Sequence, residues 1–561
     1  MTSSTDNIST EKRPAVVGNF LLDRLFQYGV RHIFGIPGDY VIRLNKLIDQ
    51  HPIEFINTTR ENTAGYMADA YGRIRGMGVA CITYGVGINI ANSLSQAYVE
   101  SSPMVVISGA AGTSESERGS SMHHLINQPK GAGLDTTQLE VFQKMTVAQA
   151  VLTDPKTAPA EINRVLQACL RHKKPVYIEF PRNVVEAPMP PGEFPELPLP
   201  KSDPEALREA LEEASSILEN SQRPLIWAGH DVHIHGLAPS LLLFAERHGI
   251  PIVSTLLGKT VVSEKHPLFV GVYQGEMSLQ EVQDFAHNSD CGIILGVMLS
   301  DVDTGMFTAH LYDEKKIIAT PSGITIGYHY YPDVLFEDFM RGLATSKSKA
   351  SFKMEIPSAR NRLPETVFKP TPKKRITVKS VFDCLQSYLT GEHFIVTDVG
   401  DCLFGATDLI LDHNSFLASA YFATLGFGTP GAVSAQLAAP DRRVIGIIGD
   451  GAFQMNGMEL STAVRYYLDP VIIVLNNHGY GTERPLIEGK FNDILNWNYT
   501  KIPDVLGGGT GYRATTEAEF DQALKEALNK RGAFSLIEVD LDTHDFSPAM
   551  QRFIKLVHNR I

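Results

Sequence analysis

Two groups of polar residues with the chemistry to bind a metal ion and a diphosphate lie near the end of the chain. Gly-Asp-Gly occupies positions 449–451, and two asparagines follow after 24 intervening residues. A carboxylate, an amide oxygen and a backbone carbonyl are hard donors, which suit an octahedral Mg²⁺ completed by diphosphate oxygens and water. We therefore predict that the metal ligands are Asp450, Asn477 and the carbonyl of Gly479.

Each polar group follows an apolar run that is typical of a β-strand. VIGIIG (444–449) precedes Asp450, VIIVL (471–475) precedes the asparagines, and residues 457–467 between them look helical. In such a βαβ unit ligands bind beyond the carboxyl ends of the strands, where glycine admits a phosphate and a helix N-terminus offers free N–H groups. We expect a diphosphate at Gly451 and Ala452. A plain strand pair with two polar turns is the alternative.

With these residues the chain resembles the thiamine-diphosphate enzymes, whose signature is Gly-Asp-Gly followed at a similar distance by asparagine. Within them it is similar to the 2-oxo acid decarboxylases, the group acting on pyruvate, indolepyruvate, phenylpyruvate and branched-chain oxo acids, over about residues 16–553. The resemblance implies two cofactors, thiamine diphosphate and Mg²⁺. It also implies non-oxidative decarboxylation of a 2-oxo acid to an aldehyde and CO₂ through a thiamine-diphosphate ylid and an enamine.

The same resemblance implies five catalytic residues. Glu61, in RENTAGYMADAYGR, matches the glutamate that hydrogen-bonds the aminopyrimidine ring and so promotes formation of the ylid. Asp39 in GIPGDY and the pair His123 and His124 in SSMHHLINQP supply groups that move protons. Glu483, in NNHGYGTERP, matches a glutamate that faces the substrate carboxylate, where burial would raise its pKa.

Further cofactor contacts follow from the segment YFATLGFGTPGA (421–432). Leu425 matches the apolar wedge that bends the cofactor, and the carbonyl of Ala423 and the amide of Leu425 would hold the aminopyrimidine edge. Asp401 replaces a threonine that pyruvate decarboxylases place near the ring, which leaves its contact open. Thr424 and Tyr480 complete the predicted set.

The preferred oxo acid depends on the side chains around the substrate. Val302 and Thr482 stand where pyruvate decarboxylases carry bulkier residues, which predicts a wider pocket. We therefore favour an aromatic or large aliphatic 2-oxo acid, with pyruvate as the alternative. The predicted pocket residues are Val302, Leu403, Phe404, Thr482, Met550 and Phe553.

The carboxy-terminal stretch predicts an amphipathic helix. Ser547 is a good N-cap, Pro548 suits the first helical position, and apolar residues recur at intervals of three and four. Simple docking against the preceding domain would explain that pattern. In related decarboxylases this helix also closes the active site.

The fold class that we predict is α/β, because apolar strand runs alternate with helical stretches three times over. Each of three consecutive domains should be a parallel sheet covered by helices, with the thiamine-diphosphate-binding fold in the first and third. The expected divisions are a flexible tail (1–14), a pyrimidine-binding domain (15–187), a linker (188–204), a central domain (205–343), a second linker (344–375), a diphosphate-binding domain (376–545) and a lid helix (546–561).

The composition of the chain limits the classes of partner that it can bind. A net charge of −13 over 561 residues argues against nucleic acid, and no apolar run is long enough to span a membrane. Five scattered cysteines without metal-ligand spacing favour free thiols and a cytoplasmic location. The partner should be a small 2-oxo acid. The resemblance places the pyrimidine-binding and diphosphate-binding residues of one site on different subunits, so we expect at least a homodimer and favour a homotetramer.

Three other functions compete with this interpretation. A thiamine-diphosphate transferase of the acetohydroxyacid synthase type would share the metal motif, but the histidine pair and Glu483 favour release of an aldehyde. A dinucleotide-binding oxidoreductase would need a complete GxGxxG motif, which GIIGDG lacks. A silent scaffold of the same fold should have lost a catalytic residue, yet Glu61, Asp450, Asn477 and Glu483 are all present.

Overall fold

The computed structural model describes residues 14–118, 120–127, 133–312, 314–346, 348 and 350–558. The chain divides into two compact units, which we call the first unit (1–98 with 102–198) and the second unit (99–101 with 199–561). Among the described residues, no helix combines the length and apolar character that crossing a bilayer requires.

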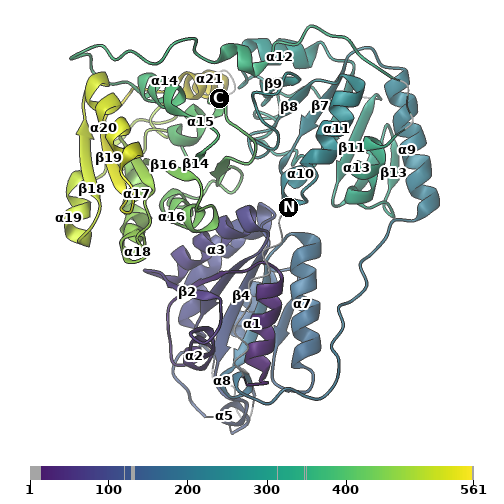
Figure 1. Ribbon diagram of the computed structural model, residues 1–561, viewed down its shortest axis with the longest axis vertical. Helices are drawn as coiled ribbons and strands as arrows, with labels where there is room; N and C mark the ends of the chain where they lie inside the picture. Colours follow the sequence, from purple (N-terminus) through teal and green to yellow (C-terminus); the bar gives the residue numbers. More distant parts are fainter. Residues whose placement is uncertain are drawn as a thin grey trace. The chain divides into compact units, whose positions relative to one another are not determined.

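The first unit is built on a six-stranded sheet in the order β2-β1-β3-β4-β6-β5, and all its pairings are parallel. Its apolar core packs between this sheet and the helices around it (Figure 1). Its elements are α1 (Val17–Gln27), β1 (His32–Gly35), α2 (Ile42–Ile48), β2 (Glu54–Asn57), α3 (Glu61–Arg75), β3 (Gly78–Ile82), η1 (Val86–Ile90), α4 (Ala91–Val99), β4 (Met104–Ala110), α5 (Thr113–Glu117), α6 (Thr137–Gln143), β5 (Gln149–Val151), α7 (Ala158–His172), β6 (Val176–Pro181) and α8 (Arg182–Val185).

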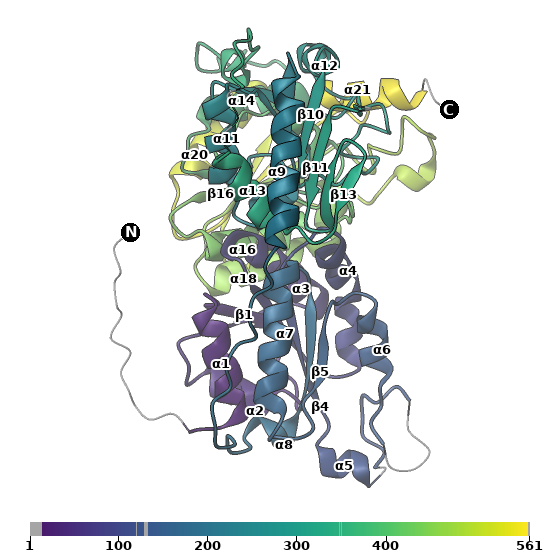
Figure 2. The ribbon, with the colours of Figure 1, turned by 90° about the vertical axis from the view of Figure 1, so that its right-hand side faces the viewer.

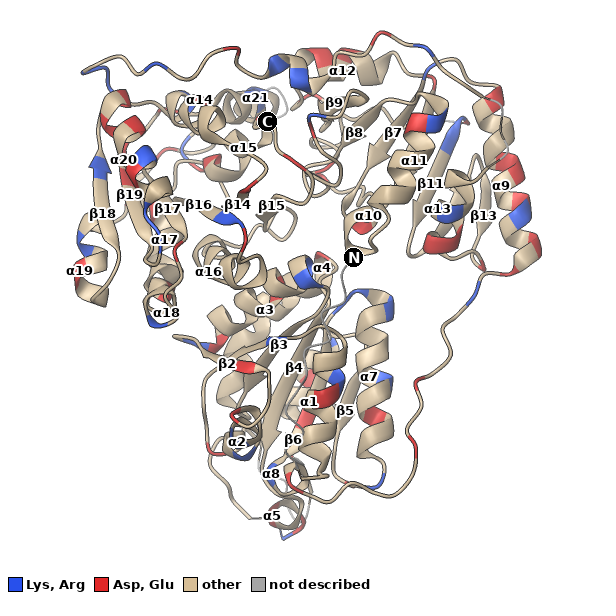
Figure 3. Cartoon of the chain, in the orientation of Figure 1, with Lys and Arg blue, Asp and Glu red and all other residues tan. Residues whose placement is uncertain are grey.

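The second unit contains two sheets, the first of which has seven strands in the order β13-β12-β11-β10-β7-β8-β9. In Figure 2, α9 runs along this sheet beside β11 and β13. Figure 3 shows both basic and acidic residues on α9, whereas β7 and β8 carry none. The elements are α9 (Pro204–Glu219), β7 (Pro224–Ala228), α10 (His230–Ile234), α11 (Ala238–His248), β8 (Ile252–Ser254), β9 (Phe269–Val272), α12 (Gln280–His287), β10 (Cys291–Leu295), β11 (Lys316–Thr320), β12 (Gly323–Ile326), β13 (His329–Tyr331), α13 (Phe336–Ala344) and η2 (Ala359–Arg362).

The other sheet of the second unit has six strands in the order β15-β14-β16-β17-β19-β18, all paired in parallel. Its elements are α14 (Val378–Tyr388), β14 (His393–Thr397), α15 (Asp401–Thr407), β15 (Phe416–Ala418), α16 (Gly428–Ala438), β16 (Arg443–Gly449), α17 (Asp450–Asn456), η3 (Gly457–Glu459), α18 (Leu460–Arg465), β17 (Val471–Asn476), η4 (Lys490–Asn492), η5 (Tyr499–Lys501), α19 (Ile502–Leu506), β18 (Thr510–Ala514), α20 (Glu517–Asn529), β19 (Ser535–Asp540) and α21 (Pro548–His558).

Three α/β sheets covered by helices confirm the predicted fold class, but the seven-stranded sheet departs from it at one edge. There β11, β12 and β13 form an antiparallel meander. Ile326 pairs with His329, which leaves a two-residue turn, and Gly327 takes the positive φ of +56° that tight hairpins need. In the sequence, the glycine in ITIGYHYY is the residue that indicates the tight turn of this antiparallel edge. The predicted domain boundaries remain a prediction.

A buried ion pair fastens the two sheets of the second unit to each other. Lys259, from the segment between β8 and β9, bonds both carboxylate oxygens of Glu264 at 2.9 Å. Its ammonium also donates to the carbonyl oxygens of Thr407 (3.3 Å) and Leu409 (2.7 Å), just past α15. Glu264 in turn accepts a bond from the backbone N–H of Leu411 at 2.8 Å. Both charged side chains are buried and fully hydrogen-bonded, as such pairs must be.

Candidate active site

Three oxygen atoms converge at the carboxyl edge of the six-stranded sheet in the second unit. The amide oxygen of Asn477 lies 2.9 Å from the carbonyl oxygen of Gly479 and 3.3 Å from Asp450 Oδ1. No proton stands between these acceptors, so their mutual repulsion requires either a turned-over amide or a cation among them. Gly479 presents its carbonyl because its φ of +148° suits glycine, and a Cβ there would meet the oxygen of Asn492 at 2.0 Å.

The carboxylate of Asp450 is buried beside these oxygens. It accepts bonds from the backbone N–H groups of Gly451 (2.7 Å) and Gly479 (2.9 Å). Burial nevertheless raises the pKa of Asp450 to about 6. A divalent cation would offset that desolvation, because a positive charge within contact distance favours the carboxylate. The three oxygens and this buried acid therefore fit a Mg²⁺ ion.

The residues after Asp450 offer a site for a phosphate. The helix α17 begins directly at the strand end, and its N-cap residue, Gly449, has no side chain with which to cap it. A Cβ on Gly451 would lie 2.8 Å from the ring of Tyr480, so only glycine fits there. The segment predicted as helical, 457–467, is helical in η3 and α18 over residues 457–465, but the preceding helix α17 was not predicted. At only seven residues, α17 is too short to show a helical periodicity in the sequence.

A cavity of about 260 Å³ adjoins these groups. Within the second unit, the structure gathers most of the predicted cofactor residues around it. Those that line it are Asp401, Ala423, Leu425, Asp450, Gly451, Ala452, Asn477, Gly479, Tyr480, Thr482 and Glu483. Thr424 does not line it, and its backbone N–H donates to Ser419 Oγ at 3.2 Å.

The loop that carries Leu425 is shaped by Asp398, a residue that the sequence analysis did not select. Its carboxylate accepts bonds from the backbone N–H groups of Gly426 (3.1 Å) and Gly428 (2.7 Å), on either side of Phe427. Asp398 is fully buried, which raises its pKa to about 6. The signal was present, because Asp398 follows the apolar run FIVT just as Asp450 follows VIGIIG.

Asp401 connects the cavity to the carboxy-terminal helix. It begins α15, and its carboxylate accepts hydrogen bonds from both the backbone N–H and the hydroxyl of Ser547. Burial raises the pKa of Asp401 to about 6, although the bonds from Ser547 act in the opposite direction. This contact answers the question that the sequence left open for Asp401. It does not exclude a cofactor contact, because Asp401 also lines the cavity.

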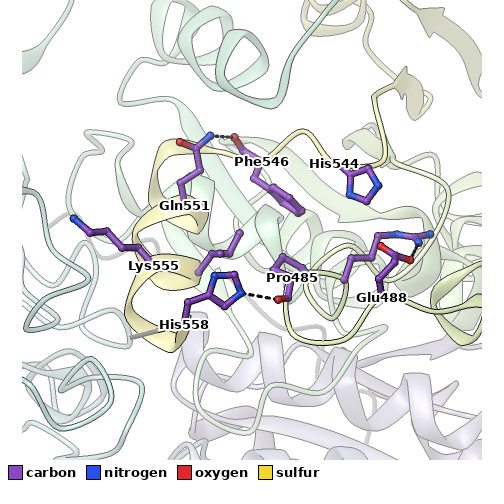
Figure 4. Close-up of a pocket in the computed structure, with 9 residues that line it drawn as sticks. Pro485, Glu488, His544, Phe546, Gln551, Lys555 and His558 are labelled. Carbon is purple, nitrogen blue, oxygen red and sulfur yellow. Dashed lines mark hydrogen bonds and ion pairs between the residues drawn. The ribbon is translucent and has the colours of Figure 1, made fainter. Parts of the chain in front are cut away.

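The predicted carboxy-terminal helix forms over Pro548–His558 (Figure 4), and residues 559–561 of the predicted span lie outside the described residues. Ser547 Oγ accepts the backbone N–H of Met550 at 3.0 Å, and Pro548 takes the first helical position. The helix packs along α15 (Figure 1). The rings of Phe553 and Phe404 stack there with centroids 5.0 Å apart. Arg552 anchors it by a bidentate pair with Asp408 at 2.7 and 3.1 Å.

Of the predicted substrate-pocket residues, Thr482 lines the cavity. The other predicted pocket residues do not line it. Leu403 packs with Val302 in a small apolar cluster, Met550 is fully buried, and Phe404 stacks on Phe553. Glu483 lines the cavity, but its side chain is exposed. The second unit alone therefore does not bury Glu483 as the sequence led us to expect. Their roles toward substrate stay predictions.

In the first unit, Glu61 is the first residue of α3, the predicted helix. A carboxylate in this position is stabilised by the helix dipole, and Asn89 Nδ2 donates to its Oε2 at 3.0 Å. The small residues of α3 allow close packing, because a Cβ on Gly65 would lie 1.9 Å from Ser93 Oγ. Glu61 remains partly exposed and can accept a further partner.

The first unit also brings together Asp39, His123 and His124, which come from two separate loops. One ligand atom from each lies within 4.8 Å of the others, and His123 Nε2 is 3.0 Å from Asp39 Oδ2. Tyr40 holds the histidine loop by donating its hydroxyl proton to the carbonyl of His123 at 2.7 Å. Gly85 permits the loop to approach, since a Cβ there would lie 2.0 Å from the carbonyl oxygen of His124.

Asp135 completes this loop and was also missed by the sequence analysis. Its carboxylate accepts the backbone N–H groups of Ile126 (2.7 Å) and Asn127 (3.2 Å), and Tyr84 donates its hydroxyl proton to the carbonyl of Asp135. Although burial raises the pKa of Asp135, the hydrogen bonds prevail and keep it below its ordinary value. The loop that carries the histidines is thus fixed at both ends.

Comparison with known families agrees with this geometry. Three models match in order: the N-terminal TPP binding domain of thiamine pyrophosphate enzymes over residues 16–131, their central domain over 211–337 and their C-terminal TPP binding domain over 398–539. The chain is also 35% identical to the indole-3-pyruvate decarboxylase of Azospirillum brasilense, over 95% of this chain and 97% of that protein.

The chain belongs to the thiamine pyrophosphate enzymes. Two further relatives are an alpha-keto-acid decarboxylase of Mycobacterium tuberculosis, 31% identical over 94% of each chain, and pyruvate decarboxylase 1 of Pisum sativum, 29% identical over 91% of this chain and 87% of that protein. The matched C-terminal model spans the converging oxygens of Asp450, Asn477 and Gly479. The matched N-terminal model spans Glu61, Asp39 and the histidine pair.

Proposed function

We propose that this thiamine pyrophosphate enzyme decarboxylates a 2-oxo acid to an aldehyde and CO₂ without oxidation. The names of its relatives support this reaction, since they include decarboxylases of indole-3-pyruvate, alpha-keto acids and pyruvate. The observation that carries the proposal is that the Asp450 carboxylate, the Gly479 carbonyl and the Asn477 side-chain amide meet beside the start of α17. When bound, thiamine diphosphate supplies the electron-accepting carbon centre that this chemistry needs.

The second unit holds the charged end of the cofactor. Asp450, Asn477 and Gly479 would hold Mg²⁺, and the N–H groups at the start of α17 would donate hydrogen bonds to the diphosphate. Leu425 would supply the apolar wedge for the cofactor. Asp398 keeps that wedge in place by holding the backbone on either side of Phe427.

The remaining steps are proton transfers by residues of the chain. Glu61 holds a proton at the pyrimidine ring nitrogen, which its position at the open start of α3 allows. His123 is oriented by Asp39 at 3.0 Å, so the pair can deliver a proton to the carbon that CO₂ leaves. Glu483, on the cavity wall, faces the substrate carboxylate.

The substrate that we propose is an aromatic or large aliphatic 2-oxo acid. Thr482, a small side chain, lines the cavity, and Gly400 beside it adds no side chain of its own, since a Cβ at position 400 would lie 2.9 Å from Thr482 Oγ1. The resemblance to an indole-3-pyruvate decarboxylase over nearly the full chain supports the same preference.

We further propose that the active assembly is a homotetramer built from homodimers, in a reducing cytoplasm. The resemblance assigns the two halves of one site to different copies, and the five free, buried cysteines support a reducing compartment.

The direct test is to incubate the purified protein with thiamine diphosphate, Mg²⁺ and a panel that contains phenylpyruvate, indolepyruvate, branched-chain oxo acids and pyruvate. We expect free aldehyde and CO₂ in equal amounts, fastest with an aromatic substrate. A carboligation product without free aldehyde would favour the transferase alternative. Absence of aldehyde from every substrate, with the cofactor bound, would refute the proposal.

A further inference from the structure

A buried hydrogen-bond network lies inside the first unit, next to the loop that carries the histidine pair. Its central residue is Gln138 of α6, which is fully buried. The Nε2 group of Gln138 donates to Ser108 Oγ at 2.7 Å and to the hydroxyl of Tyr177 at 2.9 Å. Tyr177 donates its own hydroxyl proton to Glu179 Oε2 at 2.9 Å. The mechanism proposed above uses none of these four buried groups.

The amide of Gln138 is held in one orientation. Its oxygen accepts the backbone N–H of Gly85 at 2.8 Å, and a backbone N–H can only donate. If the amide were turned over, its NH₂ group would face that N–H, donor against donor. Both N–H bonds of the amide are engaged on the inner side and its oxygen is engaged at Gly85, so the side chain connects the core of the first unit to the backbone at Gly85.

Gly85 is the surface against which the histidine loop rests. A Cβ at this position would lie 2.0 Å from the carbonyl oxygen of His124 and 3.2 Å from His124 Cβ, so the two backbones are in direct contact. His124 has a φ of +70°, a conformation that persists in a non-glycine residue only where the surrounding contacts hold it. The bond from Gly85 to Gln138 fixes one of those contacts.

The positive φ of His124 allows two adjacent imidazole rings to lie on one side of the chain. In an extended segment, neighbouring side chains point to opposite faces. Here the ring centroids of His123 and His124 are 4.5 Å apart, and His123 Nε2 lies 3.0 Å from Asp39 Oδ2. If the support under His124 were lost, its backbone would relax and the rings would separate. The arrangement of these three groups therefore depends on the position of Gly85.

We propose that Gln138 is a positioning residue for proton delivery by the histidine pair. It acts through Gly85 and not on the reacting atoms themselves. This inference rests on the proposed function, in which His123 and Asp39 deliver a proton to the carbon that CO₂ leaves. It adds a buried amide, held by a tyrosine and a glutamate of β6, on which that delivery depends. Loss of Gln138 slows proton transfer and leaves substrate binding unchanged.

The position of the loop is tested in the cofactor-free protein. Gln138→Met keeps an unbranched side chain of similar size but loses both donor bonds and the strong acceptor for Gly85. We expect amide hydrogen exchange over residues 120–127 to become about tenfold faster. The control is Asn163→Leu, which removes another buried amide of the first unit, one that donates to the carbonyl of Phe194 at 2.8 Å. Equal exchange over 120–127 in the two variants overturns the proposal.

Proton delivery is tested in the holoenzyme with phenylpyruvate as substrate. Gln138→Met should lower kcat for aldehyde release about tenfold, because misplacing a proton donor by about 1 Å is enough to do so, while KM stays within about twofold of wild type. The ratio of kcat in H₂O to kcat in D₂O should rise, since proton transfer then limits the rate. Asn163→Leu should keep the wild-type ratio. A lowered kcat with an unchanged ratio would give Gln138 a structural role only and overturn the proposal.

Tyr177→Phe is a second variant that keeps the ring in the core and removes the hydroxyl to which Gln138 donates. It should change loop exchange and the isotope ratio in the same direction as Gln138→Met, by a smaller factor. Wild-type values of both quantities would contradict the proposal even if methionine at position 138 prevents folding. If wild type releases no aldehyde from any oxo acid, the proposed function fails, and loop exchange in the cofactor-free protein still decides whether Gln138 positions the histidine loop.

Discussion

The carboxylate of Asp401 accepts two hydrogen bonds from Ser547, one from its backbone N–H at 2.7 Å and one from its hydroxyl. Asp401 begins α15 and lines the catalytic cavity, and Ser547 is the N-cap of α21. A single pair of side chains therefore ties the start of the carboxy-terminal helix to the wall of the active site.

Ser547→Ala should release the start of α21. The variant loses the N-cap bond to Met550 and the hydroxyl bond to Asp401, which together are worth about 1–3 kcal/mol. We expect faster amide hydrogen exchange over residues 548–558 and a lower kcat, with thiamine diphosphate affinity retained. Thr516→Ala removes the comparable N-cap of α20 and is the control. Equal kcat in both variants would return α21 to a purely structural role.

Asp398→Asn should change the pH dependence of stability of the cofactor-free protein. Burial raises the folded-state pKa of Asp398 to about 6, whereas an unfolded aspartate titrates near 4. The folded state then binds the proton more tightly, so the favourable contribution is complete below about pH 4 and is lost as pH rises through 6.

Wild type should therefore lose about 2–3 kcal/mol relative to Asp398→Asn between about pH 4 and pH 7, as measured by urea unfolding. Asp441→Asn, at an exposed position beyond α16, serves as the control and should track wild type. A difference that grows in favour of wild type with rising pH would contradict the assignment.

Asp450→Ala should weaken the binding of Mg²⁺ and thiamine diphosphate together. The variant removes the charged member of the three converging oxygens, so we expect a loss of tenfold or more in cofactor affinity by titration calorimetry, of order 1.4 kcal/mol. In wild type, removal of Mg²⁺ by a chelator should release the cofactor, and added Mg²⁺ should restore it. Unchanged affinity in Asp450→Ala would show that the metal binds elsewhere.

Glu61→Gln and Asp450→Ala should complement each other when they are mixed. If one site draws its two halves from different copies, a mixed dimer contains one doubly defective site and one intact site. We expect each variant alone to be inactive, and a subunit-exchanged mixture to regain up to about a quarter of wild-type activity. Size-exclusion chromatography with light scattering must show the same assembly throughout. No recovery in a mixture shown to contain mixed dimers would place both halves in one chain.

The residues best predicted from sequence are those that end buried parallel strands. Asp450 and Asn477 follow apolar runs, and the edge of the sheet brings such positions together whatever the rest of the chain does. Asp398 obeys the same rule and was overlooked only because no motif marked it. Local rules also found the N-cap at Ser547 and the helix at Glu61.

The pairings that sequence reasoning missed depend on contacts between distant segments. The Asp401–Ser547 pair joins residues 146 positions apart, and nothing local to either residue indicates its partner. The helix α17 was missed because it is short and its buried face mixes polar groups of the site with apolar ones. The antiparallel edge at β12 and β13 arises from two tight turns in a region of otherwise alternating strands and helices.

The Lys259–Glu264 pair has a consequence for how the molecule unfolds. Opening the seven-stranded sheet would carry Lys259 and Glu264 away together and leave the carbonyl groups of Thr407 and Leu409 without their charged donor, at a cost of about 1–3 kcal/mol for each buried group. If one sheet of the second unit melts while the other stays folded, that free-energy cost is incurred. Unfolding of the two sheets is therefore coupled, so heat inactivation of the catalytic cavity also responds to the stability of the sheet that contains none of its cofactor ligands.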